Sequence, residues 1–194
     1  MIKTPFLEGR PCTPWANSPP VWGEMLTPFG PICLLVGPRG VERIVLPRNP
    51  PHVLESTRDD GDDRIVRVKD QLREYFAGTR RSFDVPLDPS GTAFDLSVWR
   101  YVAGIPFGEV RTYADLARAC SMPNACRAVG AANGRNPLPL IIPCHRVLGA
   151  GGRLTGYGGG LELKARLLRL EGHAFTDESA TKTTRIALAP AAPT

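Results

Sequence analysis

The sequence lacks the features that mark membrane and secreted proteins. Its 194 residues contain no apolar run of about 18 residues, the length that a membrane-spanning helix needs. The N-terminal stretch MIKTPFLEGRPC has neither the basic flank nor the apolar core of a secretory signal. With 42% hydrophobic and 22% charged residues, the composition is typical of a globular protein, which we expect to be cytoplasmic.

Cysteine and histidine are too few, and too irregularly spaced, to predict a disulfide framework or a structural zinc site. The five cysteines are an odd count and form no C-x-x-C pair, which argues against a disulfide framework. The three histidines complete no zinc-ligand spacing with them, so we expect no metal. Reduced thiols are therefore available for chemistry. The cysteines are Cys12, Cys33, Cys120, Cys126 and Cys144.

The chain does have a modest excess of positive charge. Its 24 lysines and arginines outnumber its 19 acidic residues, which gives a formal net charge of +5. A basic surface favours polyanionic partners such as nucleic acids, although many basic proteins bind none. Charge alone therefore admits DNA as a partner without requiring it.

Hydrophobic periodicity predicts an α/β N-terminal domain over residues 23–90, after an irregular lead-in over residues 1–22. We expect a small antiparallel sheet plus one helix, and a turn cluster at the domain boundary near residues 88–91. Apolar residues at helical spacing from Ile65 to Tyr75 indicate the helix, which Gly78 can end. The predicted strands are Met25–Val36, Val41–Leu46 and Ser82–Leu87, and the polar stretch Glu55–Asp63 is predicted as a loop.

A mostly α-helical C-terminal domain is predicted over residues 91–173, followed by a disordered tail over residues 174–194. Among its helices are Phe94–Val102 and Leu161–Leu170. These assignments give an α/β domain followed by a helical one as the expected fold class.

Two further helices in this domain follow each other closely. Thr112 and Asp115 have the spacing of a capping box, and the helix they begin ends near Cys120. The next helix, about residues 124–133, consists mainly of alanine and glycine. Two short helices joined by a tight turn fit a helix-turn-helix, but they fit an ordinary helical hairpin packed in a core as well.

The segment Pro143–Arg146 (PCHR) contains the strongest candidate for reaction chemistry. An imidazole beside a thiol can take its proton directly or through a water, so His145 could activate Cys144. Adjacent residues of an extended segment point in opposite directions, so the pair can also be a coincidence. Glu171 ends the last helix, where the helix dipole disfavours negative charge; it could orient His145 or be a surface residue.

A glycine-rich stretch, Thr155–Gly160 (TGYGGG), precedes that last helix. It lacks the lysine of a phosphate-binding P-loop. It is therefore either a flexible loop or a place where the backbone approaches a flat ligand closely, with Tyr157 as a packing surface.

Three motifs, in this order and spacing, resemble the 6-O-alkylguanine-DNA alkyltransferases, most closely the short bacterial methylated-DNA-protein-cysteine methyltransferases. They are Ile105–Val110 (IPFGEV), Pro143–Arg146 (PCHR) and Gly158–Leu161 (GGGL). The similarity is close over about residues 92–172, whereas residues 25–87 match only in the layout of strands and helix. The resemblance implies a DNA repair protein that flips alkylated guanine out of the duplex and moves the alkyl group irreversibly to its own thiol.

The resemblance also implies the roles of the catalytic residues. Cys144 would be the nucleophile, His145 its base acting through a water, and Glu171 the residue that orients His145. Asn136 would hold the active-site turn, and Tyr113 would donate a hydrogen bond to the flipped base. The displacement at carbon needs no metal and no organic cofactor, and each molecule would act once.

Further residues are implied for binding the base and double-stranded DNA. Arg127 would enter the base stack. The helix of small residues around it, about residues 124–133 and called the smooth helix below, would lie in the minor groove. The Val147 carbonyl would accept from the exocyclic amine of the base. Tyr157 and Gly158 would form the pocket wall, where many relatives have Ser or Ala in place of the glycine. The implied binding residues are Arg127, Val147, Tyr157, Gly158, Gly159 and Ala114, in a protein expected to be monomeric, with cooperative binding along DNA left open.

Two alternatives come from other functional classes. A non-catalytic binder of alkylated DNA would share the fold but lack the acceptor cysteine, so the presence of Cys144 argues against it. A cysteine hydrolase built on Cys144, His145 and Glu171 would need an oxyanion hole and would turn over. The smooth helix has no role in that scheme.

Overall fold

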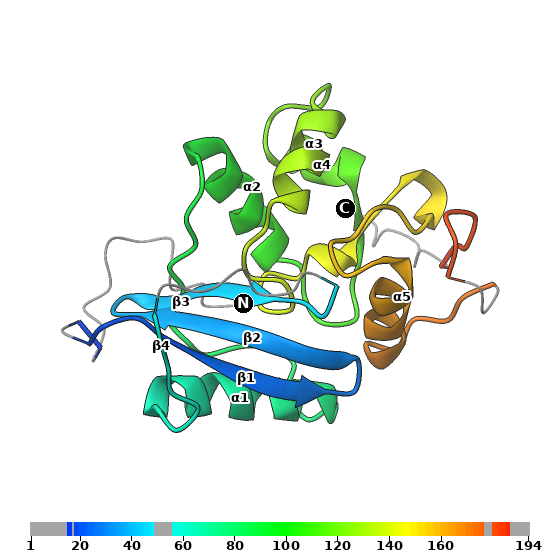
Figure 1. The fold of residues 1–194 in the computed structure, drawn as a ribbon. Coiled ribbons are helices and arrows are strands. Elements are labelled where there is room, and N and C mark those ends of the chain that lie inside the picture. The colour runs from blue at the N-terminus through cyan, green and yellow to red at the C-terminus, as the bar shows by residue number, and fades with distance from the viewer. Residues whose placement is uncertain (1–14, 17, 49–55, 177–179, 187–194) are drawn as a thin grey trace.

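The structure, a computed structural model, describes residues 15–16, 18–48, 56–176 and 180–186. Most of the lead-in predicted for residues 1–22, and Cys12 with it, lies outside these ranges. The described chain begins with a four-stranded sheet and a helix and continues as a mostly helical half (Figure 1). The strands are β1 (Val21–Thr27), β2 (Gly30–Gly37), β3 (Gly40–Val45) and β4 (Thr57–Arg58), in the order β3-β2-β1-β4.

The sheet is mixed, which corrects the prediction of an antiparallel sheet. β1 and β2 are antiparallel, as are β2 and β3, but β4 lies parallel to β1 through the pair Val21 and Thr57. The predicted strand Met25–Val36 is also wrong, because a tight turn divides it. The Thr27 hydroxyl donates to the Gly30 carbonyl at 2.7 Å, and Gly30 has a φ of +112° that favours glycine.

Helix α1 (Asp63–Phe76) covers one face of this sheet, and the helical half lies across the other (Figure 1). The predicted apolar face of α1, from Ile65 to Tyr75, is buried. Gly78 follows the helix with a φ of +74°, as its predicted role in ending the helix requires. In β2, Ile32, Cys33 and Leu34 are buried in succession, as expected of a strand covered on both faces.

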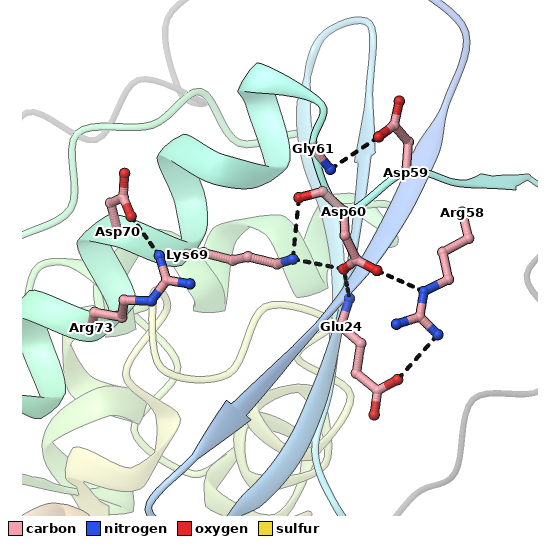
Figure 2. A network of polar contacts seen from close by, with 8 residues as sticks. All are labelled: Glu24, Arg58, Asp59, Asp60, Gly61, Lys69, Asp70 and Arg73. Carbon is pink, nitrogen blue, oxygen red and sulfur yellow. Dashed lines mark hydrogen bonds and ion pairs between the residues drawn. The ribbon is translucent and has the colours of Figure 1, made fainter.

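A network of charged side chains fastens β4 to β1 and to α1 (Figure 2). The Asp60 carboxylate accepts hydrogen bonds from the backbone N–H of Glu24 at 2.8 Å, from Lys69 Nζ at 2.6 Å and from Arg58 Nε at 2.7 Å. These contacts place a short strand in the stretch predicted as a loop. Of the predicted strand Ser82–Leu87, only Leu87 forms a bridge, with Val41.

The helical half is built from four α-helices and a two-stranded parallel pair. Capping boxes begin both α2, at Thr92 and Asp95, and α3, at Thr112 and Asp115; only the second was predicted. Among the described residues, no helix is long and apolar enough to cross a membrane. The elements are α2 (Ala93–Ala103), β5 (Arg111–Thr112), α3 (Tyr113–Ala119), α4 (Cys126–Gly134), β6 (Val147–Leu148) and α5 (Leu161–Leu170).

One continuous hydrophobic cluster joins the sheet, α1 and the helical half. A smaller cluster lies under α5 and includes Ile186, which is 3% exposed. Ile186 bridges Phe175, and Arg185 bridges Arg153. Within the described residues 174–176 and 180–186, this packing differs from the predicted disorder, because the composition of the segment did not reveal that one isoleucine has an apolar site to fill.

Candidate active site

The segment that carries Cys144 is a buried turn rather than an extended strand. Cys144–Arg146 form one turn of 3-10 helix, and all three residues are buried. Asn136 holds the approach to this turn, since its Nδ2 donates to the Ile142 carbonyl at 2.8 Å and its Oδ1 accepts from the backbone N–H of Leu138 at 3.0 Å. After the turn, β6 pairs with β5, which leads directly into α3.

His145 and Glu171 lie together although 26 positions separate them. His145 Nε2 is 2.9 Å from Glu171 Oε1, and neither side chain is exposed. A carboxylate can only accept, so Nε2 carries the proton and donates it. His145 Nδ1 is then unprotonated, and it has no hydrogen-bond partner among the described residues. This nitrogen is the one available to receive a proton.

Two further side chains bind Glu171, besides the backbone N–H of Gly108 at 3.4 Å, and neither side chain was predicted from the sequence. Arg146 donates from Nε to Oε2 at 2.8 Å and from Nη2 to Oε1 at 2.8 Å, which is a bidentate ion pair. The Tyr75 hydroxyl, from α1, donates to Oε1 at 2.7 Å. Arg146 could have been suspected from its place in the PCHR motif. Tyr75 carried no such signal, because its helical spacing indicated only a core position.

Burial and these contacts set the protonation states. Burial opposes ionisation of Glu171, but hydrogen bonds from His145 and Arg146 outweigh it and hold the pKa of that carboxyl well below its usual range. Burial lowers the pKa of His145, and the Glu171 carboxylate offsets only part of this. Burial also raises the pKa of the Cys144 thiol, against the opposing effects of Asn136 and Lys164. The resting site therefore holds a neutral thiol beside a neutral imidazole.

Lys164 is a buried cation that forms no ion pair with a carboxylate among the described residues. Its Nζ donates to the carbonyls of Val147 at 2.6 Å and Thr155 at 3.0 Å. Burial lowers the pKa of this lysine to about 8. Lys164 thus ties α5 to the residue after the cysteine turn and to the start of the glycine-rich stretch. Its position within the α5 pattern gave no sign of this role.

Aromatic rings and glycine shape the space beside the thiol. The Tyr157 ring stands edge-on to His145, with ring centroids 6.4 Å apart, and its buried hydroxyl has no partner among the described residues. A Cβ on Gly158 would meet nothing within 4 Å, so a serine or alanine fits there. A Cβ on Gly159 would lie 2.5 Å from a Leu163 methyl and 3.0 Å from the Tyr157 ring, so a larger residue there would force these side chains to move. Burial raises the pKa of Tyr113, whose ring packs on α4, and Ala114 follows it in α3.

The predicted smooth helix, α4, turns a face of small residues to solvent. Arg127, Ala128 and Ala131 are exposed, and Arg127 therefore lies outside the cluster around Glu171. The opposite side of α4 is anchored in the core, where Trp99 Nε1 donates to the Ala132 carbonyl at 2.8 Å. Of the predicted catalytic residues, Cys144, His145 and Glu171 are thus buried and Asn136 and Tyr113 are partly buried, while the predicted stack-entering arginine lies on the surface.

Known proteins share both halves of this architecture. The 6-O-methylguanine DNA methyltransferase ribonuclease-like domain matches residues 21–89, and the DNA binding domain of the same family matches residues 93–173. The methylated-DNA--protein-cysteine methyltransferase of Methanosarcina acetivorans is 44% identical over 147 residues, which are 75% of this chain and 94% of that relative. The chain belongs to the 6-O-methylguanine DNA methyltransferases. The resemblance inferred from the three motifs is confirmed.

Other methyltransferases of this family agree in sequence and in fold. The constitutive methylated-DNA--protein-cysteine methyltransferase of Bacillus subtilis is 45% identical over 126 residues, 64% of this chain and 76% of that relative. The crystal structure of Mycobacterium tuberculosis OGT in complex with DNA superposes with a TM-score of 0.72 at 40% identity. That comparison covers 84% of this chain and 96% of the other.

Proposed function

We propose that this protein repairs DNA by moving the alkyl group of 6-O-methylguanine in duplex DNA onto its own Cys144. The observation that carries the proposal is the buried pair of Cys144 and His145, in which Nδ1 is free while Glu171 holds Nε2. Its relatives are named as methylated-DNA--protein-cysteine methyltransferases, which is the same activity.

The geometry supports displacement by a thiol that is deprotonated only during the reaction. His145 Nδ1 takes the Cys144 proton through a water, and Sγ attacks the alkyl carbon. The S–C bond forms as the C–O bond breaks, and the electron pair stays on the guanine oxygen. Tyr113 donates a hydrogen bond to the leaving base, and the proton that His145 took from the thiol passes to that base, so that guanine becomes neutral and His145 returns to its neutral form. The product thioether is stable, so each molecule acts once without a metal or an organic cofactor.

DNA recognition is assigned to the helical half, over residues 91–173. In this proposal α3 and α4 form a helix-turn-helix whose second helix sits in the minor groove, where its small exposed residues allow close approach. Arg127 enters the stack in place of the flipped base. The carbonyl of Val147, with Tyr157, Gly158 and Gly159, lines the pocket for the base, beside Ala114 at the start of α3. The protein acts as a monomer on chromosomal DNA in the cytoplasm, and residues 23–90 form its other domain.

The deciding experiment is intact mass after incubation with a duplex that carries one 6-O-methylguanine. We expect a gain of one methyl group at one equivalent, located by peptide mapping on the peptide that contains Cys144. Cys144→Ala should abolish transfer and retain most of the binding to alkylated DNA. Undiminished transfer by that variant would refute the assignment of the nucleophile.

A second experiment tests the role of Arg127. Arg127→Ala should slow repair of duplex DNA by about tenfold or more, while reaction with free alkylated guanine base changes little, because only the duplex requires base flipping. Arg118→Ala, an exposed arginine at the end of α3, is the matched control. Equal losses on duplex and free base would remove Arg127 from base flipping.

A further inference from the structure

Tyr75 is the one contact to the catalytic carboxylate, among those described, that comes from the N-terminal half. It is fully buried on α1, 70 positions before His145. Its hydroxyl lies 2.7 Å from Glu171 Oε1 and 3.4 Å from His145 Nε2. The ring is fixed among aromatic side chains, with centroids 5.6 Å from Phe83 and 6.1 Å from Phe107. The hydroxyl is therefore held at this point by packing.

The direction of each hydrogen bond follows from the charge of Glu171. The pKa of Glu171 lies well below its usual range, so the carboxylate is ionised and can only accept. Tyr75 must therefore donate to it. Burial is the main reason that the pKa of Tyr75 is raised further above its ordinary value, so the hydroxyl keeps its proton and remains a donor. His145 Nε2 and Arg146 Nη2 donate to the same oxygen, at 2.9 and 2.8 Å.

We propose that Tyr75 is a positioning residue for thiol activation: by sharing Glu171 Oε1 with His145, it moderates the basicity of the imidazole that Glu171 holds in its Nε2–H tautomer. This inference rests on the proposed transfer to Cys144. An oxygen that accepts three donors attracts the imidazole proton less than an oxygen that accepts two. His145 can then receive the thiol proton at Nδ1 and release it again once the base has left.

Other titratable groups face His145 and Glu171, and they are unchanged between the Tyr75→Phe variant and the unchanged protein. They are Cys144 and Arg146 on the turn, Lys164 in α5, His173 after α5 and Tyr157 in the glycine-rich stretch. When the Tyr75 hydroxyl is removed, Glu171 holds a protonated imidazole more strongly, so the pKa of His145 rises. The transfer rate depends on neutral His145, and its acidic limb should move to higher pH.

The experiment compares Tyr75→Phe with Tyr101→Phe, a matched change at a tyrosine of α2 that is 43% exposed. The second-order rate of transfer from free alkylated guanine base is measured from pH 5 to pH 9, which removes any effect of DNA binding. For Tyr75→Phe we expect an acidic limb shifted upward by about half a unit, and therefore about a threefold loss of rate on that limb. Tyr101→Phe should match the unchanged protein.

A positioning role also predicts that Tyr75 acts only through Glu171. In a Glu171→Gln background, Tyr75→Phe should have little further effect on the rate, whereas fully additive losses would contradict the inference. If the transfer rate of Tyr75→Phe fell by the same factor at every pH, in proportion to the fraction of unfolded protein, Tyr75 would have only a structural role.

Nitrogen NMR of His145 in the unchanged protein gives a test that needs no variant. It should show the Nε2–H tautomer at neutral pH, and the Nδ1–H tautomer would overturn the inference. Absence of transfer by the unchanged protein would instead refute the proposed function.

Discussion

Two carboxylates in this chain are held by similar partners in opposite surroundings. Asp60, in the N-terminal half, binds Lys69 and Arg58 with a side chain that is 40% exposed (Figure 2). Glu171, in the C-terminal half, binds His145 and Arg146 with a side chain that is not exposed at all. Both carboxyl groups have a lowered pKa caused by hydrogen bonds from their partners.

The difference in burial gives the two clusters different functions. Around Asp60, water reaches the carboxylate and Arg58, so the exposed part of the cluster fastens β4 to its neighbours at small energetic cost, although Lys69 itself is buried. Around Glu171, water cannot solvate a charged group that loses its partner, so every partner must be in place for the site to form. Ion pairs of a carboxylate therefore hold strands and helix together in the N-terminal half. In the C-terminal half they set the protonation states of Glu171 and His145.

The largest effect should come from removing the charge partner of Glu171. Arg146→Met leaves a buried carboxylate without its bidentate cation, and we expect a loss of about 3–5 kcal/mol in the free energy of unfolding, measured with urea. The folded pKa of Glu171 lies below its unfolded value, so the unchanged protein has this stability above about pH 4.3 and loses it on acidification. The variant should show a weaker dependence on pH in that range.

Arg58→Met is the matched control in the exposed cluster. Arg58 pairs with Asp60 at 2.7 Å, and its side chain is 51% exposed. The expected loss is below about 1 kcal/mol, as for other exposed ion pairs. Similar losses for the two arginine variants would break the comparison.

An intermediate effect is expected at Lys164, and it depends on pH. With a folded pKa of about 8 and an ordinary value of 10.5, the unfolded chain binds more protons between these limits, so the lysine's contribution to stability rises with pH there. The stability of the unchanged protein relative to Lys164→Met should therefore increase by roughly 3 kcal/mol from pH 8 to pH 10.5. Urea denaturation of both proteins measures this difference, and a constant difference would contradict a desolvated cation at this position.

The smallest effect should follow from neutralising Asp60. Asp60→Asn keeps an oxygen that can accept from the buried Lys69 and from the backbone N–H of Glu24, and it loses the contact to the exposed Arg58, at an expected cost of about 1 kcal/mol or less. Thermal unfolding should show a drop of a few degrees, and the rate of alkyl transfer should stay the same. A large loss of transfer would mean that the two clusters are coupled through α1.

Regular elements with a clear pattern could be predicted from the sequence. The strand predicted over Val41–Leu46, the helix closed at Gly78 and the capping box at Thr112 depend on interactions within a few residues, which sequence spacing reveals. The turn inside Met25–Val36 was missed although Pro28 and Gly30 mark it, since apolar residues continue on both sides. The strand β4 could not be predicted, because two polar residues form it only when Asp60 is bound from elsewhere.

The candidate site shows the same division. The PCHR motif and Glu171 were found in the sequence because a thiol, an imidazole and a carboxylate carry recognisable chemistry wherever they occur. Tyr75 and Lys164 were not found, because their types and spacing fit a core position and an amphipathic helix equally well. What made them part of the site is burial against a particular partner.

The sequence by itself determined the helices with clear spacing and the reactive groups, since these follow from local spacing and from side-chain chemistry. Only the tertiary structure decided that Tyr75 of α1 meets Glu171 of the C-terminal half, and that Lys164 meets the carbonyl of Val147. The physical reason is that the strength of a polar contact and the protonation of its partners depend on exclusion of water, which is produced by residues distant in sequence packing together.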